Sequence, residues 1–237
     1  MRPINKGNSP RVFAKYEQAK QPLTERIGIY CSYCERRIPT NLAIEHIFPK
    51  DAALGYSHLE CEWDNFLLAC VNCNSAKGTT IINEQTFLLP DRDNTLPYYD
   101  YLESGIVESC GNQPIKTYAE NTLQLVGLNK VNYPALPNED ALIQQALERA
   151  GQRKATFTLA EKYRLKYDQN LLDIESIVDL ALGYGFFSIW MKAFEGVHAV
   201  RQELINTFIG TESTCFDAYT NPVSPRTANH LNHSGKS

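Results

Sequence analysis

The second half of the chain carries two amphipathic patterns. Apolar residues recur three and four positions apart over residues 174–182, and they do so again over residues 197–208. This spacing gathers them on one face of a helix. Asp173 precedes the first run and Gly183 follows it, while Gly210 follows the second run. These residue types cap helices, so both ranges are predicted to be helical.

Capping residues predict two further helices. Asn138 is followed by two acidic residues, which suit the positive end of a helix dipole. Near the N-terminus, Ser9 can cap a helix whose first residue is Pro10, and apolar residues then recur at helical spacing until Pro22. We therefore predict a helical arm that ends at this second proline.

Short strands are predicted elsewhere in the chain. Residues 42–47 form a brief strand-like run that ends at a proline turn, and residues 51–64 are irregular. Residues 98–107 are typical of a hairpin around the turn dipeptide Ser104-Gly105. Strands in one part and helices in the other predict an α+β fold.

A polar, proline-bounded segment over residues 89–97 is predicted to divide the chain. Residues 1–96 then hold the helical arm and the short strand, and residues 97–220 form a mostly α-helical lobe. Residues 221–237 are polar and interrupted by prolines, which predicts a disordered tail.

Composition is that of an ordinary globular protein, with 43% hydrophobic and 21% charged residues. No apolar run approaches the roughly 20 residues needed to span a bilayer, and the first residues lack the apolar core of a secretory signal. We therefore expect a cytoplasmic location. The net charge is −4, and 11 basic residues balance 11 acidic ones up to Thr95. Such a chain has little general attraction for nucleic-acid phosphates, so a local patch or a partner would have to supply it.

Four of the seven cysteines form two Cys-x-x-Cys pairs. A tight turn brings both thiols of such a pair to one side, and two pairs make the closed tetrahedral site typical of structural zinc. Free core thiols or a redox pair are the alternative, but no thioredoxin-like βαβ pattern surrounds either pair. The predicted zinc ligands are Cys31, Cys34, Cys70 and Cys73, whereas ligand spacing is missing around Cys61, Cys110 and Cys215.

Between the two cysteine pairs, polar residues follow an informative order. Glu45 and His46 lie in the predicted strand, Asn65 precedes the second pair, and Asn74 follows its last cysteine. A lone histidine on a strand is more often a core residue than a catalyst. Together, however, these residues resemble the motif of the HNH, or ββα-metal, nucleases, with Asn74 in place of the final histidine. The resemblance implies a small zinc-stabilised nuclease domain within residues 1–96.

The chemistry of phosphodiester hydrolysis fits these residue types. The ordinary pKa of histidine lies near neutrality, so His46 can accept a proton from water as a general base. Oxygen donors from Glu45 and Asn74 favour Mg²⁺ or Mn²⁺ as the catalytic ion. The resemblance implies that Asn65 braces the loop that orients His46. Taken singly, Asn65 and Asn74 could instead serve in turns or helix caps.

Basic residues near the motif are candidate phosphate contacts. Lys77, Lys50 and Arg37 flank it, although each could equally be a solvated surface charge. A second basic run lies over residues 149–166. We interpret this run as a solvated helix face, with a nucleic-acid or partner contact as the lesser alternative.

Beyond the motif, the chain resembles a narrower family, the PtuB HNH subunits of Septu anti-phage systems, which also occur with retrons. The similarity spans about residues 1–217. It implies a defence effector that acts beside the ATPase subunit PtuA, and in some loci beside a retron reverse transcriptase with its noncoding RNA or DNA. Residues 97–220 would then be the partner-binding lobe. The landmarks are Met1-Arg2-Pro3-Ile4, Tyr30–Glu35, Ile44-Glu45-His46, Asn65–Ser75, Pro90–Thr95, Gly127-Leu128-Asn129 and Cys215-Phe216-Asp217.

Two alternatives to a DNA-cutting effector stay open. The motif hydrolyses a phosphodiester without choosing DNA over RNA, so an RNase, for instance one that cuts tRNA, has the same residues. A non-catalytic zinc module that recruits partners is the other alternative. The combination of Glu45, His46 and Asn74 argues against it, since a scaffold needs none of them together.

Overall fold

The computed structural model describes residues 1–132 and 140–237 and confirms the predicted α+β class. The predicted cap at Asn138 lies outside the described residues. Two separate antiparallel sheets are present, β1 (Ala43–His46) with β2 (Phe66–Ala69) and β3 (Tyr99–Tyr101) with β4 (Val107–Ser109). The α-helices of the described residues are α1 (Lys20–Ile27), α2 (Val71–Lys77), α3 (Ile115–Leu125), α4 (Asp140–Asp168), α5 (Ile174–Tyr184), α6 (Phe187–Ala193) and α7 (His198–Thr207).

Strands β1 and β2 and helix α2 form the ββα unit that positions the site. Strand β2 is apolar and buried along its whole length, and His46 of β1 pairs in register with Phe66. Helix α2 begins directly after Cys70, whose side chain accepts a hydrogen bond from the Cys73 amide. The helix ends at Gly78, which adopts a φ of 52°. The short predicted strand and helix are thus both present.

The N-terminal arm begins its helix later than its capping residues predict. A 3₁₀ turn, Tyr16–Ala19, leads into α1, and Ser9 Oγ donates to the Arg11 carbonyl instead of capping a helix. The prediction that Pro22 ends the helix is therefore wrong. Pro22 lies in the first turn of α1, where a backbone N–H has no partner within the helix and its loss costs nothing.

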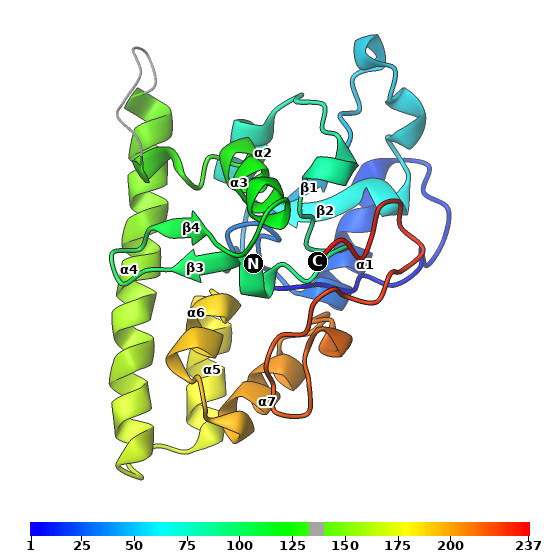
Figure 1. Ribbon diagram of the computed structural model, residues 1–237. Coiled ribbons are helices and arrows are strands. Elements are labelled where there is room, and N and C mark those ends of the chain that lie inside the picture. The colour runs from blue at the N-terminus through cyan, green and yellow to red at the C-terminus, as the bar shows by residue number, and fades with distance from the viewer. Residues whose placement is uncertain (133–139) are drawn as a thin grey trace.

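The second half follows its amphipathic patterns closely. Helix α5 starts after Asp173, whose carboxylate accepts a 2.8 Å hydrogen bond from the Ser176 amide. It passes Gly183 and ends at Gly185, where a side chain would meet the backbone of residues 35–37. Helix α7 and the β3–β4 hairpin also lie where predicted. Helix α4 runs along one side of the molecule (Figure 1). Across the described ranges, no helix has the length and hydropathy to cross a membrane.

One hydrophobic core joins the two parts of the chain that were predicted to divide near residue 97. The same cluster contains Phe66 and Leu89 from the first part and Leu123, Trp190 and Phe208 from the second. All five side chains are buried. The ββα unit therefore rests on the helical part through continuous apolar contact.

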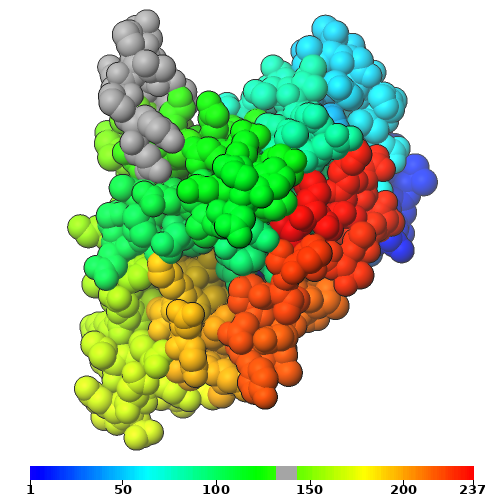
Figure 2. Space-filling model, in the orientation of Figure 1, coloured from blue at the N-terminus to red at the C-terminus, as the bar shows by residue number. Residues whose placement is uncertain are grey.

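The prediction of a disordered tail is wrong. Residues 221–237 lie along the surface, in red in Figure 2. Arg226 is buried and donates to the carbonyl of Ile4, while the carbonyl of Ser237 accepts from the amides of Asn94 and Arg226. The polar segment 91–95 is itself buried. Segment 91–95 supplies hydrogen-bond partners for the polar residues of the tail. The composition of the tail alone does not reveal that such partners exist.

Candidate active site and metal centre

The four predicted zinc ligands meet at one point between the two Cys-x-x-Cys turns. Their sulfur atoms all lie within 4.8 Å of one another, and all four residues are buried. The turns place them there through backbone donors: the amide of Cys34 points at Cys31 Sγ over 3.5 Å, and that of Cys73 points at Cys70 Sγ over 3.4 Å. Two loops far apart in sequence thus present one compact sulfur cluster.

The spacing of these sulfurs fits a tetrahedral zinc ion. With Zn–S bonds of about 2.3 Å, the edge of a regular tetrahedron is about 3.8 Å. Cys34 Sγ and Cys70 Sγ lie 3.7 Å apart, far beyond the roughly 2.05 Å of a disulfide. Burial raises the pKa of the Cys31 thiol well above its usual value, so a thiolate there needs a cation beside it. The cluster has the donors and the dimensions of a structural zinc site.

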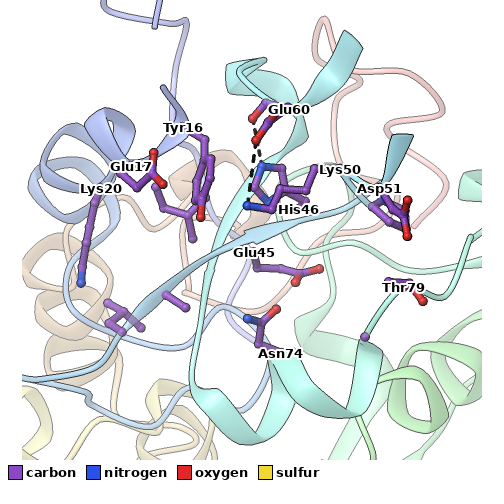
Figure 3. A pocket seen from close by; sticks show the side chains of 15 residues that line it. Tyr16, Glu17, Lys20, Glu45, His46, Lys50, Asp51, Glu60, Asn74 and Thr79 are labelled. Carbon is purple, nitrogen blue, oxygen red and sulfur yellow. Dashed lines mark hydrogen bonds and ion pairs between the residues drawn. The ribbon is translucent and has the colours of Figure 1, made fainter. Parts of the chain in front are cut away.

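A cleft of about 740 Å³ lies beside strand β1 (Figure 3). Strand β1 contributes Glu45 and His46, and α2 contributes Asn74 from the turn after the last cysteine. Glu45 and Asn74 lie next to each other in the cleft (Figure 3). The remaining wall comes from the segment before α1, from the loop after β1 and from the end of α2, including Tyr16, Glu17, Lys20, Pro49, Lys50, Asp51, Glu60, Gly78 and Thr79.

His46 is held in one orientation. Its Nε2 lies 2.9 Å from the backbone carbonyl of Glu60, and its ring meets Phe66 and Tyr16 edge to face at 5.2 and 5.0 Å. A carbonyl only accepts, so Nε2 carries the hydrogen and the lone pair resides on Nδ1. Burial lowers the pKa of His46 below its ordinary value of 6.5. The imidazole is therefore neutral near pH 7, as a proton acceptor must be.

Asn65 ties the loop after β1 to the segment before β2. Its Oδ1 accepts a 2.7 Å hydrogen bond from the Phe48 amide, and its Nδ2 donates to the carbonyls of Phe48 and Leu59 at 3.0 and 3.1 Å. Phe48 lies two residues after His46, and Leu59 lies one residue before Glu60. The Asn65 side chain thus holds together the backbone after His46 and the backbone before Glu60, whose carbonyl contacts the His46 ring. Asn65 itself is buried and lies outside the cleft.

Glu45 is a buried carboxylate with a buried counter-ion. Only 2% of its side chain is exposed, and Lys77 Nζ lies 3.1 Å from its Oε1. Burial raises the pKa of Glu45 to about 7, although Lys77 and a 3.5 Å contact with the Tyr33 hydroxyl oppose this rise. A metal ion beside Glu45 could balance the charge of this buried carboxylate, as Lys77 does here.

The three predicted phosphate contacts lie in different surroundings. Lys50 lines the cleft and places its ammonium 3.7 Å from the centre of the Tyr16 ring. Lys77 does not fit the prediction, because its buried ammonium binds Glu45 and donates 2.7 Å to the His46 carbonyl. Arg37 also does not fit, because it is exposed beside a separate hollow formed with Leu182 and Ile209.

The second basic run is likewise not one solvated face. Arg149 is buried against Cys73 and Arg153 against the turn at Gly105, whereas Lys154 and Lys162 of the same helix are exposed. The interpretation as a solvated face is thus wrong for these two arginines. Their burial depends on contacts with segments far away in the sequence, which charge patterning does not show.

Sequence reasoning also missed part of the cleft. Tyr16, Lys20 and Thr79 line it, and the Glu60 carbonyl orients His46. Tyr16 looks like an apolar helix position in the sequence, and a backbone carbonyl in an irregular segment has no sequence signal at all. A basic residue one turn beyond Tyr16 is the only local sign that this arm could face a phosphate.

The ββα unit thus combines a four-cysteine cluster with an acid, a histidine and an amide in one cleft, which is the set of groups expected of a phosphodiester hydrolase. Residues 31–80 match the family model described as HNH endonuclease. The matched range contains the complete zinc cluster together with Glu45, His46, Asn65 and Asn74. This chain therefore carries an HNH endonuclease domain, which is a nucleic-acid hydrolase. No curated protein matches the chain.

Proposed function

We propose that this protein is an endonuclease in which His46 is the general base. The observation that carries the proposal is the orientation of His46 by the Glu60 carbonyl, in the same cleft as Glu45 and Asn74. This contact leaves the proton-accepting lone pair on Nδ1. Because the imidazole is neutral near pH 7, it can take a proton from the water that attacks the phosphorus atom.

Glu45 and Asn74 would hold the catalytic ion. Both offer oxygen donors, and such donors favour Mg²⁺ or Mn²⁺ over zinc. The buried Glu45 carboxylate, paired only with buried groups, suits a site for a divalent cation. When bound, such an ion supplies charge neutralisation on the phosphate and on the departing oxygen. Asn65 serves as a positioning residue, because its amide fixes the loops on both sides of His46.

Substrate approach would use the open side of the cleft. Lys50 and Lys20 stand on its rim, and their charges suit the phosphates that flank the scissile bond. Hydrolysis of a phosphodiester by these residues does not itself require deoxyribose or ribose. Both DNA and RNA, including tRNA, are therefore tested as substrates in the assay described below.

The resemblance to PtuB supports a further proposal about the cellular role. The protein would be the nuclease effector of an anti-phage complex in the cytoplasm, acting beside the ATPase PtuA and in some loci beside a retron reverse transcriptase and its noncoding RNA or DNA. A chain with a net charge of −4 binds phosphate backbones weakly by itself, which suits an effector that depends on partners. The helical part, residues 97–220, would bind the partner.

Cleavage assays with matched variants test the proposed activity. The full chain, alone and with its ATPase, is incubated with phage DNA and with total RNA in Mg²⁺ or Mn²⁺, and the cut ends are mapped. His46→Ala should lower the rate by roughly 100-fold or more, because a general base contributes about that factor. His58→Ala, at an exposed histidine near the cleft, is the control. A wild-type rate of cleavage in His46→Ala would exclude His46 as the general base.

Co-purification tests the partner proposal separately. Leu165 of α4 and Leu171 just after it are exposed apolar residues of the helical part. Leu165→Glu should reduce capture of the ATPase, whereas Val12→Glu, at an exposed apolar residue of the first 96, should not. If the wild type, Leu165→Glu and Val12→Glu all captured the ATPase equally, residues 97–220 would not be the part that binds it.

A further inference from the structure

Two buried arginines lie one helical turn apart on α4, and the first of them contacts the sulfur cluster. Arg149 Nη1 lies 3.3 Å from Cys73 Sγ and 3.0 Å from the Val126 carbonyl, and Nη2 donates 2.8 Å to the Gly127 carbonyl. One helical turn further on, Arg153 donates from Nε to the carbonyl of Gly105 in the β3–β4 turn. Both side chains are at most 3% exposed.

These guanidinium groups are not fully satisfied by hydrogen bonds. Within residues 1–132 and 140–237, Arg149 Nε and both terminal nitrogens of Arg153 are buried without a hydrogen-bond partner. A buried cation that lacks such partners is costly unless a negative charge lies close by. Burial lowers the pKa of Arg153, and the Cys34 sulfur opposes this change. The Cys73 sulfur, 3.3 Å from Arg149 Nη1, makes the cluster the nearest source of that counter-charge for Arg149.

A zinc ion bound by four thiolates supplies that charge. The four ligands together carry four negative charges and the ion carries two positive ones, which leaves a net charge of −2. The guanidinium groups of Arg149 and Arg153 would offset part of this charge, and Arg36 beside Cys70 would offset another part. Without the ion and its four thiolates, the Arg149 guanidinium 3.3 Å from Cys73 Sγ would lose this counter-charge.

Between residues 143 and 157, the buried stripe of α4 offers few apolar side chains. Its buried positions are Ala146, Arg149, Ala150 and Arg153, spaced as one helical stripe, and larger apolar side chains begin only at Phe157. Alanine buries too little surface to anchor a helix strongly. Figure 1 shows this helix beside the β3–β4 hairpin, and a side chain at Gly105 would meet the backbone of Ala150.

We propose that Arg149 and Arg153 are positioning residues that bind α4 to the charge of the zinc–thiolate centre. Zinc then does more than close the ββα unit, because it also attaches the helical part to this unit. This inference rests on the zinc site and not on the nuclease activity.

The test uses the full chain and two measurements that do not involve cleavage. The affinity for zinc is measured by competition with a chromogenic chelator, and amide hydrogen exchange is followed across the helices. Arg149→Met and Arg153→Met should each weaken zinc binding by roughly 10- to 100-fold, as loss of a partner of a metal ligand does. In the zinc-loaded variants, residues 143–157 should exchange faster while α7 stays protected.

Two further variants keep the result interpretable. Lys154→Met, on the exposed face of the same helix, should match the wild type in both measurements. Arg149→Lys retains the charge and should recover most of the zinc affinity, which a purely steric role would not produce. Wild-type zinc affinity and unchanged exchange in both methionine variants would overturn the proposal. A wild-type chain that holds no zinc would overturn the zinc site and this proposal together, whatever its activity.

Discussion

The Lys77 ammonium lies 3.1 Å from the Glu45 carboxylate, and neither side chain is more than 2% exposed. Lys77 also donates to the carbonyl of His46, so one lysine holds two neighbouring residues of β1. The pair links the end of α2 to the strand that carries His46, the proposed general base. It also balances a buried negative charge that would otherwise require a proton or a metal ion.

Removal of this lysine should destabilise the protein in a pH-dependent way. Without its cation, Glu45 must be buried either unpaired or protonated, so Lys77→Met should lose about 3–5 kcal/mol at pH 8. The folded-state pKa of Glu45 is already raised from 4.5 to about 7 and should rise further in the variant. A protonated Glu45 needs no cation, so the loss should shrink toward pH 5.

Denaturant unfolding at pH 5 and pH 8 measures this difference, with Lys50→Met as the control at a half-exposed lysine of the same cleft. Mg²⁺ should raise the stability of Lys77→Met more than that of the wild type if Glu45 binds the ion. A loss that is independent of both pH and Mg²⁺ would show that the lysine stabilises the fold in another way.

Substitution of Asn65 should separate positioning from metal binding. Asn65→Ala leaves the Phe48 amide and two carbonyls without their partner, which should cost about 1–3 kcal/mol of stability. Cleavage should fall by roughly 10- to 100-fold, as it does when a supporting hydrogen bond is lost. Zinc content should not change. Asn206→Ala, at an exposed position on α7, is the control, and full activity in Asn65→Ala would contradict the bracing role.

Zinc content should follow the four clustered cysteines and no others. Metal analysis of the purified chain should find about one zinc per chain, since four thiolates make one closed site. Cys31→Ser or Cys73→Ser should lose the metal and lower the melting temperature, because metal binding is linked to folding. Cys110→Ser lies outside the cluster and should retain both. A zinc-free chain that melts normally would refute the site.

The pH profile of cleavage should reveal which group limits the reaction in acid. Burial lowers the pKa of His46 below 6.5, so with saturating Mg²⁺ the rate should hold down to that pH and then fall. With little Mg²⁺ the decline should begin near pH 7, because protons compete with the ion for Glu45, whose pKa is raised to about 7. A decline that starts above pH 7 and ignores Mg²⁺ would contradict both assignments.

Much of the candidate site could be predicted because its signals are local. A Cys-x-x-Cys turn brings two thiols together whatever surrounds it, and Glu45 and His46 share a strand by their adjacency. Asp173 caps α5 through an amide three residues away. Each of these features depends on a few neighbouring residues, so spacing alone is sufficient to predict it.

Spacing along the chain was enough to predict the four clustered cysteines, the strand of the acid and the histidine, and the amphipathic helices of the second half. Packing between distant segments instead turns Lys77 inward to Glu45, selects the tautomer of His46 through the Glu60 carbonyl, and holds the tail beyond residue 220 on the buried segment 91–95. Such packing also brings Arg149 to a cysteine 76 positions earlier. In each case a polar group finds its partner through packing between distant segments, and the burial that makes the contact strong has no period or spacing in the sequence.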